Sequence, residues 1–354
     1  MLKKSFPTLG RFRFTVQIVM LFVTVYGGAL LGTYTVDRIS KALPSLSCAY
    51  DDMTGDHCIL IVTQHQLHHR IGEALSNAQH LAVNVFIPTL ISAGTFFALF
   101  FFLNKAFCGW VCPMGTVQEL LYKIGRRLGR PMHRFKPGNV GKVRPAKWIM
   151  LLVFVLGLPL LAGMGIAADD LGAPFCQVCP SRLATTLLTA DVEQVATRTS
   201  SAIDLMLNAA GNALFGFVII AALAVRQPFC RICPLLSWNA LFQKLSPMRL
   251  VKREHQKCEK CSICQLACPM DIHEIGREHG NKAFHEDCTL CGRCAEYCPD
   301  DDVIQIKFFG IRLFGSGREY YKQRVKQESP EGTPKQKVIW LKSVDAKATQ
   351  GDAE

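Results

Sequence analysis

Histidine is absent from all four long apolar runs of this 354-residue chain. A haem held across a bilayer needs axial ligands, most often histidine, on the helices around it. The runs therefore exclude a transmembrane haem held between two histidines. Charged residues are also sparse, at 19% of the chain against 49% hydrophobic residues. This balance favours a membrane protein over a soluble one.

The apolar runs predict four transmembrane helices, at residues 14–36, 81–103, 148–168 and 205–225. Each is close to the length of about 20 residues that a bilayer core of roughly 30 Å requires. The first run is too long for the apolar core of a signal peptide and has no evident small-residue cleavage site. We therefore expect it to remain as a membrane span.

Lysine and arginine are scarce in two loops, residues 37–80 and 169–204, and abundant in residues 1–13, in 104–147 and after residue 225. Because the cytoplasmic loops of membrane proteins are the basic ones, we expect a multi-pass protein of a prokaryotic inner membrane with both termini in the cytoplasm. The net charge of +12 then reflects an inner face against anionic lipid. Base-reading and stacking motifs are lacking, so no nucleic-acid partner is expected.

The strongest motif is a run of four cysteines followed by proline, which occurs twice: Cys258-x2-Cys261-x2-Cys264-x3-Cys268-Pro269 and Cys288-x2-Cys291-x2-Cys294-x3-Cys298-Pro299. This spacing is typical of bacterial two-cluster ferredoxins, in which the fourth cysteine of each run ligates the other cluster. It predicts one [4Fe–4S] cluster on Cys258, Cys261, Cys264 and Cys298, and a second on Cys268, Cys288, Cys291 and Cys294. A zinc or disulfide module is the alternative.

A shorter phrase, Pro-Phe-Cys-x2-Cys-Pro, occurs at 174–180 and 228–234, with a near copy at 107–113. The repetition predicts two helix hairpins related by a pseudo-twofold axis along the membrane normal. Such hairpins would bring four thiols together at the inner membrane edge: Cys108, Cys112, Cys230 and Cys233. Four thiolates match the ligand set of a third iron–sulfur cluster. A structural zinc site or buried free thiols are the alternatives.

The remaining cysteines, Cys48, Cys58, Cys176 and Cys179, are expected at the outer membrane edge. They could hold a fourth iron–sulfur cluster or another metal, or they could form disulfides, since the outer compartment is oxidising. The same side carries His65, His68 and His69, which would share one face of an α-helix. These histidines could accept protons from a quinol or bind a metal such as copper, or could simply form a solvated face.

Several features together resemble the membrane polyferredoxins of the NapH type, which are related to the membrane half of NosR. They are the four spans, the cysteine motifs at 107–113 and 230–235, the link Ser246-Pro-Met-Arg-Leu250, and the ferredoxin repeat. The resemblance covers roughly residues 80–310. It implies a subunit that moves electrons from the quinol pool toward a periplasmic or membrane-bound redox protein. It also implies ligand roles for the eight ferredoxin cysteines and for Cys108, Cys112, Cys230 and Cys233.

The chain departs from that family in two ways. The four outer cysteines are not part of the family's common pattern. No outer loop is long enough to hold the flavin-bearing domain of NosR. Both departures concern the side on which the redox partner is expected.

These inferences predict an integral membrane α-helical protein. Residues 1–13 form a cytoplasmic N-terminus, 14–245 a four-helix membrane domain in two repeated hairpins, 246–314 a small α+β ferredoxin domain, and 315–354 a polar mobile tail. No residue pattern suggests a general acid, base or nucleophile in a substrate pocket. An enzymatic role would therefore rest on the oxidation of quinol, with a quinone docked between the helices, or on the partner protein. The alternatives are an assembly factor that reduces or delivers copper to a periplasmic enzyme, and a redox sensor.

Overall fold

The computed structural model describes residues 8–31, 58–76, 83–130, 133–135, 137–188, 201–253, 258, 261–280 and 285–328. The chain divides into two units, which are considered separately below. The helical unit is Thr15–Ser246, and the ferredoxin unit combines Pro247–Glu354 with Met1–Phe14. The division after Ser246 lies next to the boundary expected from the sequence. The N-terminal residues, expected to stand alone, belong instead to the ferredoxin unit.

The helical unit is built from long helices joined by short helical turns, which are labelled η. Its first half contains α1 (Leu9–Leu31, which begins in the other unit), α3 (Ile59–Gln66), η1 (Leu67–Gly72), α4 (Glu73–Ser76), α5 (Val83–Leu103), η3 (Phe107–Val111) and α6 (Pro113–Arg127). Its second half contains α7 (Pro137–Ile149), η4 (Met150–Gly157), α8 (Leu158–Gly163), η5 (Asp169–Gly172), α9 (Pro174–Val178), α10 (Pro180–Leu188), α11 (Ala202–Ala222), η6 (Phe229–Arg231) and α12 (Pro234–Phe242).

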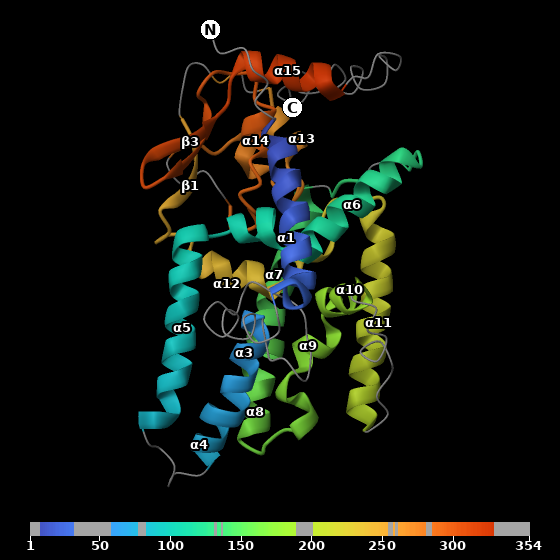
Figure 1. Ribbon diagram of the computed structural model, residues 1–354, viewed down its shortest axis with the longest axis vertical. Coiled ribbons are helices and arrows are strands. Elements are labelled where there is room, and N and C mark those ends of the chain that lie inside the picture. The colour runs from blue at the N-terminus through green and yellow to red at the C-terminus, as the bar shows by residue number, and fades with distance from the viewer. Residues whose placement is uncertain are drawn as a thin grey trace. The chain divides into compact units, whose positions relative to one another are not determined.

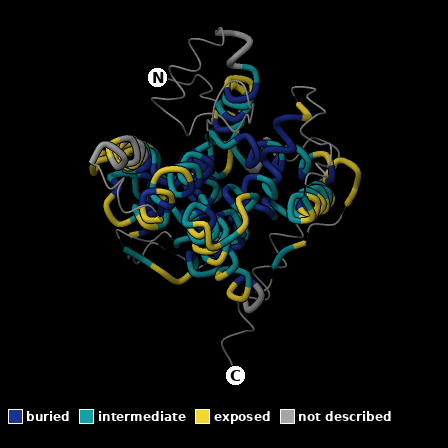
Figure 2. The backbone as a smooth tube through the Cα atoms, turned by 90° about the horizontal axis from the view of Figure 1, so that it is seen from below, coloured by how far each residue is buried: buried dark blue, intermediate teal, exposed yellow. Residues whose placement is uncertain are grey.

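Three helical stretches among the described residues are long and apolar enough to cross a membrane: Leu9–Tyr26, Val140–Gly163 and Ala202–Ala222. They overlap three of the four expected spans. The remaining expected span, residues 81–103, corresponds to helix α5, which carries no charged residue along its 21 positions. Large apolar side chains such as Met206 and Ile220 point outward, each 72% exposed, and exposed and buried stretches alternate along the helices in Figure 2. Such an outward apolar surface suits lipid rather than water.

Within this unit α5 and α11 lie on opposite sides of α3, α7 and α8, and α12 runs across their direction (Figure 1). Helix α6 contacts both α10 and α11, and α9 contacts α3 and α11. The α6–α11 crossing is close because Gly125 has no side chain: a Cβ there would lie 1.9 Å from the carbonyl oxygen of Leu223. Segments 107–113, 174–180 and 228–234, far apart in sequence, are thereby packed into one interior.

The three Cys-Pro pairs of the helical unit each lie at the start of a helix. Pro113, Pro180 and Pro234 are the first residues of α6, α10 and α12. Proline is favoured at a first helical position because its missing N–H would have no partner there. The preceding cysteine has an extended ψ angle, 119° at Cys112 and 123° at Cys233. The motif therefore turns the chain and leaves a thiol at the start of each helix.

The ferredoxin unit combines short helices with an antiparallel sheet. The sheet order is β1–β2–β3, with β1 at Met248–Lys252, β2 at Ile304–Phe308 and β3 at Ile311–Gly315. Phe309 and Gly310, both with positive φ, connect β2 to β3, as expected for a two-residue hairpin whose twist matches its strands. Helices α13 (Ile263–Ala267) and α14 (Arg293–Glu296) and the turn η7 (Glu274–Gly276) complete the cysteine-bearing part.

Residues 318–328, which the sequence places in a mobile tail, form helix α15 (Arg318–Glu328). Arg324 of α15 makes an ion pair with the buried carboxylate of Glu296, with an N–O distance of 2.8 Å. The backbone N–H of Gly10 donates to the same carboxylate at 2.9 Å, and the backbone N–H of Leu9 donates to the Tyr320 hydroxyl. The prediction of a disordered tail is wrong over these residues, because a tertiary ion pair stabilises a helix whose composition is polar.

Candidate metal centres

The two ferredoxin runs bring their thiols close to one another, and the division of these thiols into two ligand sets stays a prediction. Cys264 interacts electrostatically with Cys258, Cys261 and, from the second run, Cys298. Cys268 of the first run likewise interacts with Cys288 and Cys291 of the second. These interactions are compatible with the predicted exchange of the fourth cysteine between runs.

Left-handed residues create this arrangement. Ser262 (φ 58°) and Gly292 (φ 76°) occupy equivalent places between the second and third cysteines of the two runs. Each precedes a short helix, α13 or α14, that carries the third cysteine. The turn bends the chain back on itself, so that consecutive thiols face one another rather than alternate.

A cavity lies against the second set. All four of its cysteines, Cys268, Cys288, Cys291 and Cys294, line this cavity, together with apolar side chains that include Leu250, Met270 and Ile275. Burial raises the pKa of Cys268 to about 12, and burial and the neighbouring thiols raise the pKa of Cys294 well above its ordinary value. Neutral thiols are thus favoured without a metal, and a cation is needed to make them thiolate ligands. The donor set and the enclosed space fit a [4Fe–4S] cluster.

A buried lysine lies beside the first set. Lys252 on β1 is 1% exposed, and its Nζ donates to the carbonyl oxygens of Ile275 at 2.7 Å and Gly276 at 2.9 Å. Burial raises the pKa of the Cys264 thiol, and the charge of Lys252 opposes that rise by stabilising the thiolate. The same charge would stabilise the more negative, reduced state of a cluster bound there.

Replacing Lys252 with methionine is therefore expected to lower the reduction potential of the first ferredoxin cluster by on the order of 50 mV, because about 1 kcal/mol corresponds to roughly 40 mV in a one-electron couple. An EPR-monitored redox titration of the full chain measures this shift. Lys252→Arg keeps the charge and is the control. Equal shifts in both variants would show that the charge of Lys252 does not act on the cluster.

The helical unit brings Cys108, Cys112, Cys230 and Cys233 together; they are called the first membrane set below. Cys233 interacts electrostatically with each of the other three, and Cys230 with both Cys108 and Cys112. Cys112 and Cys233 begin α6 and α12, whereas Cys108 and Cys230 lie in the turns η3 and η6.

Hydrogen-bond donors surround the first membrane set. Asn239 Nδ2 donates to Cys108 Sγ at 3.5 Å, and Gln118 Nε2 donates to Cys230 Sγ at 3.5 Å. The backbone N–H groups of Met114 and Gly115 point at the sulfur of Cys112. Donors of this kind stabilise thiolates and tune the potential of a bound cluster. The donor set therefore fits an iron–sulfur cluster.

Cys58, Cys176 and Cys179 also come together; they are called the second membrane set. Cys176 and Cys179 each interact electrostatically with Cys58. Cys48, the fourth cysteine expected with them, lies outside the described residues. None of the cysteines that the structure describes is in a disulfide bond.

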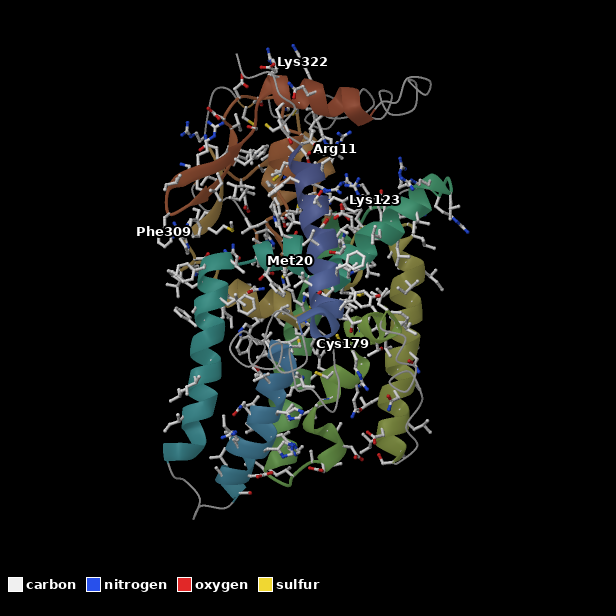
Figure 3. All side chains as sticks on the ribbon, viewed as in Figure 1. Arg11, Met20, Lys123, Cys179, Phe309 and Lys322 are labelled. Carbon is white, nitrogen blue, oxygen red and sulfur yellow. The ribbon has the colours of Figure 1, made fainter. Side chains whose placement is uncertain are left out.

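The expected position of the second membrane set at the opposite membrane face is wrong. Cys112 of the first set interacts electrostatically with Cys58 and Cys179 of the second. Such interactions are incompatible with sites separated by a hydrocarbon core of roughly 30 Å. The reason is that α9 and α10 turn back into the helical unit, and Figure 3 shows Cys179 about midway along it rather than at an end.

The three histidines lie side by side, with ring centroids 5.6 Å apart for His65 and His69 and 4.1 Å apart for His68 and His69, but the face that they form is only partly solvated. Residues 67–72 are π-helical, so the spacing of an α-helix no longer applies, and His68 is only 6% exposed. His68 Nε2 pairs with Asp169 at 2.9 Å, and His68 Nδ1 lies 3.2 Å from His69 Nε2. His69 Nδ1 lies 3.2 Å from Glu73. These groups form one continuous hydrogen-bonded chain.

Three buried amides that donate to sulfur were not predicted from the sequence: Gln64, Gln118 and Asn239. A signal was present, because a glutamine follows a cysteine by six positions at both Cys58 and Cys112. The spacing alone does not reveal that each amide reaches a cysteine more than a hundred residues away.

Comparisons with known proteins bear on the ferredoxin cysteines and on the first membrane set. The family described as "4Fe-4S binding domain" matches residues 85–131 and 207–253, which contain the first membrane set. The family described as "4Fe-4S dicluster domain" matches residues 257–304, which contain the eight ferredoxin cysteines. No solved structure matches the chain.

Among curated relatives, an uncharacterized protein of Methanocaldococcus jannaschii, MJ0750, is 30% identical over 56% of this chain and 71% of its own length. The ferredoxin-type protein NapH of Haemophilus influenzae is 23% identical over 65% of this chain and 73% of its own. The regulatory protein NosR of Pseudomonas aeruginosa is 27% identical over 60% of this chain, but only 27% of NosR is matched. The chain therefore belongs to the NapH-type polyferredoxins, iron–sulfur electron-transfer proteins related to NosR.

Proposed function

We propose that the chain carries electrons between the quinol pool or cytoplasmic donors and a periplasmic or membrane-bound redox protein. In this proposal it crosses a prokaryotic inner membrane four times, with both termini in the cytoplasm. The ferredoxin cysteines hold two [4Fe–4S] clusters, and the first membrane set holds a third. When bound, these clusters accept and release single electrons.

The observation that carries this proposal is the convergence of Cys108, Cys112, Cys230 and Cys233 inside an apolar helical unit. The two pairs are more than a hundred residues apart in the chain, yet all four thiols interact. Both pairs lie within segments that match the 4Fe-4S binding domain. A ferredoxin with clusters in its soluble part alone would not need this second ligand set in a membrane.

The surrounding residues suit the first membrane set to electron transfer. Phe107, Phe229 and Leu236 are at most 4% exposed and exclude water from the thiols. Lys105 and Arg231 lie close enough to stabilise the thiolates of Cys108 and Cys230. Buried cations and N–H donors both favour the more negative, reduced state of a cluster. They would therefore raise the reduction potential of a cluster bound in this apolar environment.

The histidine chain supports a quinol as electron donor. Oxidation of a quinol releases protons together with electrons, so the site needs groups that accept protons. Asp169, His68, His69 and Glu73 form such a chain, with the outer groups Asp169 and Glu73 exposed at 92% and 59%. The ring nitrogens of His68 and His69 are already engaged, which suits this group to proton transfer rather than to copper delivery.

Reduction by quinol tests this function. Full-length protein, purified anaerobically and placed in liposomes, is mixed with a short-chain quinol, and cluster reduction is followed by visible bleaching and EPR. We expect quinol to reduce the clusters, and His68→Phe to slow that reduction about tenfold or more while dithionite still reduces them fully. His279→Gln, at a half-buried histidine of the ferredoxin unit, is the control.

Two outcomes would contradict the proposal. Clusters that dithionite reduces and quinol does not would exclude the quinol pool as donor. An equal rate in His68→Phe and the unmodified chain would show that the histidine chain does not accept the protons.

A further inference from the structure

The helical unit contains the same hydrogen-bonded arrangement twice. Gln64 Nε2 donates to Cys176 Sγ at 3.2 Å and to the carbonyl oxygen of Leu60 at 3.0 Å. Its Oε1 accepts the backbone N–H of Phe175 at 3.2 Å. Gln64 thereby links α3, the helix that follows Cys58, to Cys176 and to the residue that precedes it in α9.

Gln118 makes the matching three bonds. Its Nε2 donates to Cys230 Sγ at 3.5 Å and to the carbonyl oxygen of Met114 at 3.1 Å, and its Oε1 accepts the backbone N–H of Phe229 at 3.0 Å. Both glutamines are completely buried. Buried polar side chains in a membrane unit are costly and mark functional positions.

The two arrangements are in one register. Each residue of the arrangement around Gln118 lies 54 positions after its counterpart in the arrangement around Gln64. The pairs are Cys58 and Cys112, Gln64 and Gln118, Phe175 and Phe229, Cys176 and Cys230, and Cys179 and Cys233. A shared offset across two separate segments of chain indicates an internal duplication that kept the thiols and their donors together.

Corresponding cysteines of the two arrangements also directly precede helices. Cys58 precedes α3 as Cys112 precedes α6, and Cys179 precedes α10 as Cys233 precedes α12. The backbone N–H groups of Ser181 and Arg182 point at the sulfur of Cys179, and the Arg182 side chain stabilises the thiolate of Cys176. Amides and positive dipoles at helix starts favour thiolates.

We propose that Cys58, Cys176 and Cys179 form a second iron–sulfur site inside the helical unit, adjacent to the first membrane set. This proposal rests on the proposed function, because it takes the first set as the template. The position that corresponds to Cys108 is Thr54, so the duplicated residues supply three thiolates. Three thiolates suffice for a cluster whose remaining iron is absent or carries another ligand.

Gln64 is a positioning residue of this second site. Its amide fixes both the sulfur of Cys176 and the backbone that carries it, as Gln118 does for Cys230. Removal of either donor would make the reduced state of its own cluster less favourable and lower the potential of that cluster alone.

Iron and acid-labile sulfide per chain, measured on anaerobically purified full-length protein, test the proposal. The double variant Cys176→Ser/Cys179→Ser is expected to lose about three to four iron atoms per chain and to keep the EPR signals of the ferredoxin clusters. Val178→Ala, between the two cysteines at the end of α9, is the control and should lose none. Unchanged iron in the double variant, or a Cys176–Cys179 disulfide found by mass spectrometry of the native protein, would overturn the second site.

The parallel variant Cys230→Ser/Cys233→Ser distinguishes this proposal from the proposed function. If iron is lost in Cys230→Ser/Cys233→Ser but not in Cys176→Ser/Cys179→Ser, the proposed function stands and the second site is overturned. Iron lost in neither variant would overturn both. If the cysteine variants fail to fold, Gln64→Leu and Gln118→Leu are expected to lower the potentials of two different clusters in a redox titration. A shift with Gln118→Leu and none with Gln64→Leu would overturn the second site.

Discussion

Replacing Cys230 and Cys233 together with serine is expected to remove one complete cluster, about four iron and four sulfide per chain. The four thiols of the first membrane set interact with one another, and a serine hydroxyl does not replace a thiolate as a ligand at neutral pH. Two ligands from η6 and α12 would be lost at once. The remaining pair, Cys108 and Cys112, would be too few to hold a cubane.

The ferredoxin unit provides the internal reference for this experiment. Its clusters depend on other cysteines and should keep their EPR signals in the double variant. Ile232→Val, between the two cysteines, is the matched control for disturbance of the loop. Undiminished iron in the double variant would mean that the membrane thiols hold no cluster, and electron transfer would then be confined to the ferredoxin unit.

A second large effect is expected from Gly125→Ala. The added Cβ would lie 1.9 Å from the carbonyl oxygen of Leu223 and 2.8 Å from its carbonyl carbon. Both are backbone atoms, so no side-chain rotation relieves the clash, and α6 and α11 must separate. We expect a loss of about 3 kcal/mol or more in the free energy of unfolding, at the upper end for overpacking.

The same change should reach the first membrane set. Cys112 directly precedes α6, and α11 leads into the turn that carries Cys230, so separation of the two helices moves ligands from two sides of the site. Thermal unfolding in detergent and iron per chain measure the two effects. Gly216→Ala on α11 is the matched control, since nothing lies within 4 Å of its added Cβ, and alanine should be neutral or slightly stabilising there. Equal unfolding temperatures in the two variants would contradict the close crossing.

The two membrane sets also change how a route across the bilayer is understood. Cys58 and Cys179 interact electrostatically with Cys112, so the sites are neighbours within the helical unit rather than one at each face. A short step between adjacent sites would replace a single step over the full hydrocarbon core. The described histidine chain, on η1 and η5, belongs to the same unit.

The predictions that held were those carried by local spacing. The ferredoxin thiols lie close together because each short run turns at Ser262 or Gly292, between its second and third cysteines, and their role as cluster ligands stays a prediction. Three of the four expected spans recur as candidate spans, because a long uncharged run has few alternatives to a helix. The grouping of the membrane cysteines followed from a repeated phrase, which places equivalent thiols in equivalent turns.

The predictions that failed depended on tertiary packing. Composition suggested a mobile tail after residue 315, whereas the ion pair between Arg324 and Glu296 holds α15 in place. Helical periodicity placed His65, His68 and His69 on one face, and their rings do lie side by side. It did not predict that a π-helical turn buries His68 beside Asp169.

By itself, the sequence determined which cysteines share a motif and which segments are apolar enough to enter a membrane, because spacing and hydropathy act over a few neighbouring residues. Only the tertiary structure decided how deep each set lies and which amides reach the sulfurs. Those outcomes depend on the turn of α9 and α10 into the helical unit and on contacts, such as Gln64 with Cys176, between residues more than a hundred positions apart. No local pattern encodes such distances, since they arise when separate helices pack.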